Sequence, residues 1–195
     1  MPRQPGLARD RRAAAMVEAA LIFPLLATML LGTFELSQYV RATARVTNAA
    51  TAIADLVAQQ SAAITGGSTG VLGNFCKAGK FVMTPFATAG TAGQVGAFAA
   101  AIASVTNNAG TASVDWESDA ACGISATALG ATATTLATSP TNTVPNAGDS
   151  VIVVKVTYLY KGVTQSILPG TFTLSQITLA RPRSGTTVSC TSPCN

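Results

Sequence analysis

The chain has 195 residues, of which 48% are hydrophobic and only 10% are charged, and its formal net charge is +4. This length allows one ordinary domain together with a membrane anchor. The chain has no histidine and only eight acidic residues, so the commonest general base and most metal-ligand sets are missing. The composition therefore argues against an enzyme and against most metal sites. Basic residues beyond residue 40 are scattered, so no basic stripe indicates nucleic acid as a partner.

An apolar run occupies residues 14–34, and four arginines precede it: Arg3, Arg9, Arg11 and Arg12. As a helix the run would be about 31 Å long, which matches a hydrocarbon core of about 30 Å. Positive charge before a span holds that end in the cytoplasm. We therefore expect a basic cytoplasmic leader over residues 1–13, a transmembrane helix over residues 14–35, and a periplasmic remainder.

A cleaved export signal is the alternative interpretation of the same run. Such a signal needs a short apolar core followed by a small-x-small cleavage site. The stretch "GTFELSQYVRATA" fits poorly, because a helical pattern continues through it. Pro24 lies within the run and predicts a kink, which membrane helices tolerate when neighbouring groups satisfy the freed carbonyl.

The helical pattern continues beyond the apolar run. Positions spaced alternately by three and four residues form one face: Leu36, Tyr39, Thr43, Val46, Ala50, Ile53, Val57, Gln60 and Ile64. This spacing predicts an amphipathic helix over residues 36–65, ended by the glycines of "TGGSTG". Together the two segments would form one helix about 78 Å long. Its outer half must bury its apolar stripe against the C-terminal domain or against a neighbouring subunit.

Residues 66–195 are expected to form a small α+β domain with an antiparallel sheet. A short helical piece is expected at residues 71–83, followed by two strands around the turn "NNAG". The clearest strand is "DSVIVVKVTYLY", and its core face is predicted to hold alternate residues: Ile152, Val154, Val156, Tyr158 and Tyr160. "GTFTLSQITLARPR" supplies the last strand, which proline ends. Residues 123–148 are rich in small polar residues and predict a long surface loop.

Four cysteines lie beyond the apolar run: Cys76, Cys122, Cys190 and Cys194. This placement fits an oxidising compartment, and four cysteines allow three disulfide connectivities. We favour a small ring between Cys190 and Cys194 in "CTSPC", with Cys76 joined to Cys122. Free buried thiols are the alternative.

Other polar groups give weaker signals. Three carboxylates fall on one side of an expected strand and could hold calcium: Asp115, Glu117 and Asp119. Their spacing matches no calcium loop, and carboxylates on a solvated strand face are common, so we predict no metal site. Arg181 and Arg183 are expected to decorate the surface or to pair with Asp149. No serine has a histidine or a convincing lysine beside it, so we predict no catalytic residues.

One stretch near the N-terminus and two nearer the C-terminus resemble a known family. "AAAMVEAALIFPLLATMLLGTFELSQYVRA" is similar to the N-terminal helix of the TadE-like proteins of the tight-adherence (Flp-type) pilus, a branch of the type IV pilin-like systems. It shares their order of small residues, Val-Glu, aliphatic residues, proline, a leucine-rich stretch and Gly-x-x-Glu. "VTYLY" and "ITLARPR" resemble the closing strands of alphaproteobacterial members. The frontal resemblance covers about 30 residues.

The resemblance implies a role for Glu18. Pilin-like precursors are cut by a prepilin peptidase before the apolar helix, which leaves a new amine and a glutamate at the fifth mature position. In this chain the cut would fall between Ala13 and Ala14, although Ala13 stands where the family usually has glycine. The amine of Ala14 and the Glu18 carboxylate would then share a helix face. The alternative is that the chain is not cut and Glu18 reaches an arginine near the headgroups.

The resemblance further implies a non-enzymatic minor pilin or pseudopilin that takes part in pilus assembly. Its partners would be the inner membrane, other pilins, proteins of the pilus machine and a prepilin peptidase. No cofactor, nucleic acid or small-molecule substrate is expected. The alternative function is that of a permanently anchored periplasmic scaffold or sensor that does not enter a fibre.

Overall fold

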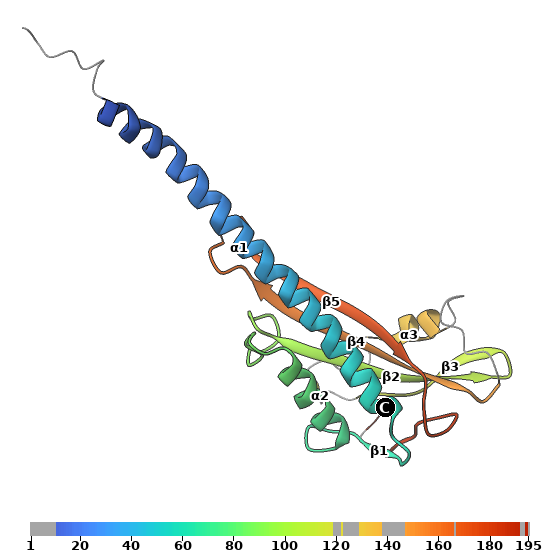
Figure 1. Cartoon of the computed structure of the whole chain (residues 1–195). Coiled ribbons are helices and arrows are strands. Elements are labelled where there is room, and N and C mark those ends of the chain that lie inside the picture. Colours follow the sequence, from blue (N-terminus) through green and yellow to red (C-terminus); the bar gives the residue numbers. More distant parts are fainter. Residues whose placement is uncertain are drawn as a thin grey trace, which may run out of the picture.

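The computed structural model describes residues 11–118, 122, 129–137, 147–165, 167–191 and 194. One long helix, α1 (Arg11–Ala58), runs from one end of the molecule to the other. Figure 1 shows that its N-terminal half projects away from the rest of the chain, whereas its C-terminal half lies against an antiparallel sheet. This arrangement confirms the predicted α+β class.

Helix α1 has 48 residues, which corresponds to about 72 Å. It continues on both sides of Pro24, and a kink there stays a prediction. The predicted stripe is buried at Val46, Ala50, Ile53 and Val57, whereas Gln60 is half-buried. Leu36 and Thr43 are exposed instead, because the face that meets the sheet is rotated so that Glu35 and Ala42 are buried in their place.

The helix ends at Ala58 and not near residue 65, so the predicted C-terminal boundary of the helix is wrong. The backbone N–H of Arg183 donates to the Ala58 carbonyl at 2.8 Å, and the Ser184 hydroxyl donates to the Gln59 carbonyl at 3.3 Å. These donors satisfy carbonyls that the end of a helix leaves unpaired. Ile64 is buried as predicted but belongs to strand β1 (Ile64–Thr65), which pairs in parallel with β6 (Cys190–Thr191).

The sheet has four strands in the order β3-β2-β4-β5, and every neighbouring pair is antiparallel. The strands are β2 (Phe98–Asn108), β3 (Thr111–Glu117), β4 (Ser150–Lys161) and β5 (Thr171–Ala180). The turn at "NNAG" joins β2 to β3 as predicted. Ala109 and Gly110 there have positive φ angles of 53° and 95°, and the Asn107 side-chain oxygen accepts the Gly110 N–H at 2.7 Å.

One face of the sheet packs against α1 and α2 (Val71–Val82). The alternate β4 residues predicted to face the core are all buried there: Ile152, Val154, Val156, Tyr158 and Tyr160. Ile102 of β2 and Ile53 of α1 belong to the same buried cluster. The alternation of β4 therefore identified the main core correctly.

Part of the opposite face is also buried, so the prediction of a long surface loop over residues 123–148 is wrong for residues 130–137, whereas residues 123–128 and 138–146 lie outside the described residues. Helix α3 (Gly130–Ala137) covers Val151 and Val153 of β4, with Leu129, Ala133 and Ala137 buried in between. Small alanine side chains let this short helix lie close to the strands, and the apolar residues on this face of β4 need such a cover.

Arg183 pairs with a carboxylate that the sequence analysis did not name. Its guanidinium lies 2.8 Å from the Asp55 carboxylate of α1, so this arginine joins the chain after β5 to the end of the long helix. Asp115 accepts hydrogen bonds from the hydroxyls of Ser104 and Thr106. Asp119, the third carboxylate considered for calcium, lies outside the described residues.

Candidate functional site

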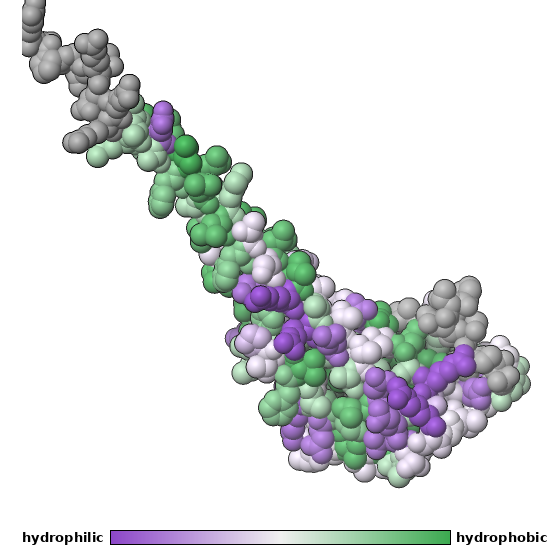
Figure 2. Space-filling view, in the orientation of Figure 1, coloured by the Kyte–Doolittle hydropathy of each residue, from purple (hydrophilic) through white to green (hydrophobic). Residues whose placement is uncertain are grey.

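The projecting half of α1 exposes large apolar side chains on all sides. They include Leu21, Phe23, Leu26 and Leu30, and no part of the most apolar stretch is buried within the molecule. Figure 2 shows apolar residues over most of the visible face of this half. By length and composition the helix can cross a membrane. Water would make such an exposed surface costly, whereas lipid would not.

The residues predicted to matter for processing lie at the free end of this half. Helix α1 begins at Arg11, so Ala13, Ala14 and Glu18 all belong to it. Ala14 and Glu18 are exposed and one turn apart, which places them on one face of the helix. This arrangement permits a contact between an amine at residue 14 and the carboxylate. Cleavage between Ala13 and Ala14 stays a prediction.

Glu35 is a site residue to which the sequence analysis assigned no role. Its carboxylate is fully buried where the projecting half of α1 meets the sheet domain. The Thr164 hydroxyl and the Gln165 N–H each donate a hydrogen bond of 2.8 Å to it, and the Ile167 N–H donates one of 3.2 Å. A buried carboxylate needs such donors to offset its desolvation. The loop between β4 and β5 is thereby fastened to α1.

Two glycines make this close approach possible. A Cβ atom at Gly162 would overlap the Glu35 carboxylate oxygen, and one at Gly32 would overlap the end of the Ile167 side chain. Gly32 and Glu35 are the two residues of the Gly-x-x-Glu pattern in the sequence. The Gly-x-x-Glu pattern is the only feature of the sequence that pointed to this contact. The loop that contacts Gly32 and Glu35 is more than a hundred residues away along the chain, so the pattern did not identify it.

An aromatic cluster continues the contact next to Glu35. The Tyr39 ring meets the rings of Tyr160 and Phe172 edge to face, with centroids 5.8 Å and 6.0 Å apart. Such pairs stabilise packing beyond the area they bury. Burial raises the pKa of Tyr160, and the negative charge of Glu35 raises that pKa further. The phenol therefore stays neutral, as its packed position requires.

The four cysteines are joined in two pairs. Cys76 of α2 is bonded to Cys122, with Cα atoms 5.4 Å apart, and Cys190 is bonded to Cys194, with Cα atoms 6.1 Å apart. These are the two pairs that the sequence analysis favoured. The first tethers α2 to the chain that follows β3, and the second closes a ring near the C-terminus. The oxidation state of the thiols in the cell stays a prediction.

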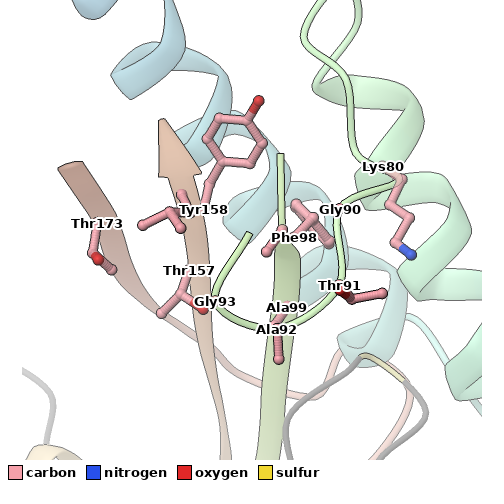
Figure 3. Close-up of a pocket in the computed structure, with 12 residues that line it drawn as sticks. Lys80, Gly90, Thr91, Ala92, Gly93, Phe98, Ala99, Thr157, Tyr158 and Thr173 are labelled. Atoms are coloured by element: carbon pink, nitrogen blue, oxygen red, sulfur yellow. The ribbon is translucent and has the colours of Figure 1, made fainter. Parts of the chain in front are cut away.

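A hollow of about 470 Å³ lies beside the glycine-rich turn at residues 90–93. Figure 3 shows Lys80 and Tyr158 at this hollow, with their polar ends pointing apart. The Tyr158 hydroxyl donates to the Ala87 carbonyl at 2.9 Å, and most other lining residues are glycine, alanine or threonine. The hollow brings no nucleophile together with a base among the residues described. In that same part of the chain no three His, Cys, Asp or Glu residues gather to hold a metal.

The fold and the exposed helix define an α+β protein built on one helix that can span a membrane. Residues 13–55 match the family described as TadE-like protein. The match confirms the predicted resemblance over the projecting half of α1 and much of the half that packs on the sheet. The matched stretch lies within α1 and makes up less than a quarter of the 195 residues. No curated protein matches the chain, and no solved structure matches it either.

Proposed function

We propose that this protein is a non-enzymatic minor pilin or pseudopilin of the tight-adherence pilus, anchored in the inner membrane by residues 14–35. The observation that supports this most is the division of α1. One half exposes apolar side chains to its surroundings, and the other half is buried against the sheet. The family match covers most of both halves. Such a helix can hold a periplasmic domain at the membrane and can pack beside the helices of other pilins.

In this proposal a prepilin peptidase cuts between Ala13 and Ala14, and the new amine meets the Glu18 carboxylate of the same or a neighbouring subunit. Two unit charges about 4 Å apart gain roughly 4 kcal/mol at an effective dielectric of 20. A carboxylate near the bilayer centre costs about 3 kcal/mol, so the pair offsets the cost of keeping Glu18 in lipid. A contact between neighbouring subunits would also set their axial register.

Replacement of Glu18 by glutamine tests the mechanism. Glu18→Gln removes the charge, so membrane insertion should be as complete as in the unchanged protein, whereas pilus assembly should be lost. Ala13→Gly, which restores the residue usual in the family, should leave piliation intact and processing at least as fast. The measurements are the N-terminal sequence of the mature protein and the count of pili per cell.

The alternative function, a permanently anchored periplasmic scaffold or sensor, predicts the opposite result. A Glu18 that only reaches toward headgroup arginines contributes a desolvation cost and no required partner, so Glu18→Gln should be silent or mildly stabilising. A protein that retains Met1 or Pro2 at its N-terminus, with normal piliation in the Glu18→Gln strain, would favour the scaffold and reject the pilin-like mechanism.

The proposed periplasmic location of the sheet domain predicts that its four cysteines are oxidised. Non-reducing peptide mapping of the protein from cells should recover the pairs Cys76 with Cys122 and Cys190 with Cys194. The same mapping after reduction is the control for peptide recovery. Alkylation of all four cysteines without a reductant would reject both the disulfides and the periplasmic location.

A further inference from the structure

The described residues of the loop between β4 and β5, 162–165 and 167–170, have a fixed position along α1. We call this loop the tip loop. Three of its hydrogen-bond donors hold the Glu35 carboxylate, and the Ile167 side chain lies where a Cβ of Gly32 would be. Figure 1 shows this loop beside α1, at the end of the β4–β5 hairpin. The loop therefore lies at the level of residues 32–35 of the helix.

That level is the outer edge of the proposed membrane span. The apolar run ends at Phe34, and each residue advances a helix by about 1.5 Å. Gly32 thus lies about 3 Å inside the edge of the hydrocarbon, and Glu35 lies just outside it. The polar headgroup region extends about 5–7 Å further on each side of a bilayer. The tip loop is therefore level with the boundary between acyl chains and headgroups.

The tip loop also has the side chains that suit this boundary. Val163 is 64% exposed and Ile167 is 52% exposed, although neighbouring polar groups of the loop are turned inward to Glu35. Lys161 is exposed at the end of β4, directly before the loop, and Arg41 is exposed on α1 about 10 Å beyond Phe34, from where its long side chain can extend back toward the headgroups. Residues 29–48 and 150–170 contain a single carboxylate, that of Glu35, and it is buried. Apolar side chains beside exposed cations are the pattern that binds an anionic lipid surface.

We propose that the tip loop is a second membrane contact, which places Val163 and Ile167 among the outermost acyl carbons while Lys161 and Arg41 face anionic headgroups. The proposal rests on the membrane anchoring proposed above. Because the loop meets the bilayer on one side of α1, it would fix the rotation of the sheet domain about the helix axis. Glu35 acts here as a positioning residue that holds the loop at this depth.

A lipid surface fits the tip loop better than a protein partner does. A stable protein interface buries more than about 1,000 Å², and two exposed aliphatic side chains on one short loop supply much less. The loop is also continuous with the exposed apolar surface of α1, as the contact between Ile167 and Gly32 shows. We propose above that lipid surrounds this surface of α1, so lipid would also contact the adjoining tip loop.

The test uses fluorescence quenching by spin-labelled lipids. The full-length protein with Val163→Trp is reconstituted into vesicles of phosphatidylethanolamine and phosphatidylglycerol that carry a nitroxide near the headgroup or deep in the acyl chain. Interfacial side chains lie about 5–10 Å deep, so the shallow label should quench about half of the added emission and the deep label clearly less. The unchanged protein is the matched control, since its single tryptophan, Trp116, is buried in β3.

A second reporter separates this inference from the anchoring on which it rests. With Leu30→Trp, a tryptophan in the projecting half of α1, both labels should quench the added emission if the helix spans the bilayer. Quenching of Leu30→Trp without quenching of Val163→Trp would overturn the tip-loop proposal and leave the anchor intact. No quenching of either reporter would overturn both. A blue shift of Val163→Trp emission without quenching would indicate that the side chain is buried in protein, either in this chain or in a second copy of it, and would reject lipid.

Glu35→Ala tests the positioning role. Combined with Val163→Trp, it removes the acceptor of the three loop hydrogen bonds, so the preference for the shallow label should fall toward equal quenching by both labels. Quenching of Leu30→Trp should not change in the same background. An unchanged shallow preference would show that Glu35 does not set the depth of the loop and would overturn that part of the proposal.

Discussion

The two halves of α1 belong to one continuous helix, yet they solve different packing problems. In the projecting half, large side chains such as Phe23 and Leu30 are exposed in every direction. In the packed half, the buried positions alternate alanines with a few larger residues: Ala42, Val46, Ala49, Ala50, Ile53, Ala54, Val57 and Ala58. Small side chains allow the helix to approach the sheet closely, whereas bulky ones on all sides suit a uniform apolar solvent. The distribution of side-chain size around the helix therefore distinguishes the half that packs on protein from the half for which we propose lipid, in addition to the difference in hydropathy.

The largest effect should come from a charge placed in the projecting half. Leu26 and Leu36 are equally exposed, at 57% and 56%, but only Leu26 lies near the middle of the proposed span. Leu26→Arg should cost about 3 kcal/mol of insertion free energy and release much of the protein from membranes on carbonate extraction. Leu36→Arg should leave it bound. If carbonate released both variants to the same extent, the assignment of the projecting half to the membrane and of the packed half to the periplasm would be wrong.

A smaller effect is expected from enlarging an alanine in the packed half. Ala50 is fully buried against the sheet, so Ala50→Leu should force the helix away and lower the free energy of unfolding by about 1–3 kcal/mol. Ala44, on the same helix but exposed, provides the control, and Ala44→Leu should be nearly neutral. Thermal unfolding of the protein in detergent measures both. Similar melting temperatures would mean that α1 does not rely on close approach to the sheet.

The smallest effect concerns the ion pair that ties the end of α1 to the chain after β5. The side chains of Arg183 and Asp55 are 61% and 44% exposed, so Arg183→Ala should lower the free energy of unfolding by less than about 1 kcal/mol. The backbone bond from residue 183 to the Ala58 carbonyl survives this change. A double-mutant cycle with Asp55→Ala isolates the pair. A coupling energy well above about 1 kcal/mol would contradict this expectation. It would mean that the ion pair is shielded from water more strongly than its exposed fractions indicate.

The strands and the hairpin turn were predicted well because alternation and turn residues are patterns among neighbours in the sequence. The alternation of β4 identified its core face, and "NNAG" marked the hairpin between β2 and β3. Helix α3 was missed because its sequence, "GATATTLA", has the composition of the loop around it. Its stability comes from burying Ala133 and Ala137 against β2 and β4, and no local pattern reports such a contact.

The candidate site was predictable only in part, for the same reason. The apolar run and the spacing of Ala14 and Glu18 are local features, so the sequence displays them directly. The role of Glu35 depends on donors from Thr164 to Ile167, which only the folded hairpin brings to the helix. The Gly32-x-x-Glu35 spacing marked the acceptor, but nothing in the sequence named its partners.

Because α1 is continuous, a tilt of its N-terminal half would also move the sheet domain packed on its C-terminal half. The helix runs unbroken from the proposed membrane span to Ala58, and the sheet is packed against its C-terminal half. Ala58 is about 36 Å beyond Phe34 along the axis, so a tilt of about 10° at the membrane edge would displace that end by about 6 Å. A small reorientation of the span among neighbouring helices, or in a membrane of different thickness, is thus magnified into a large displacement of the domain far from the bilayer.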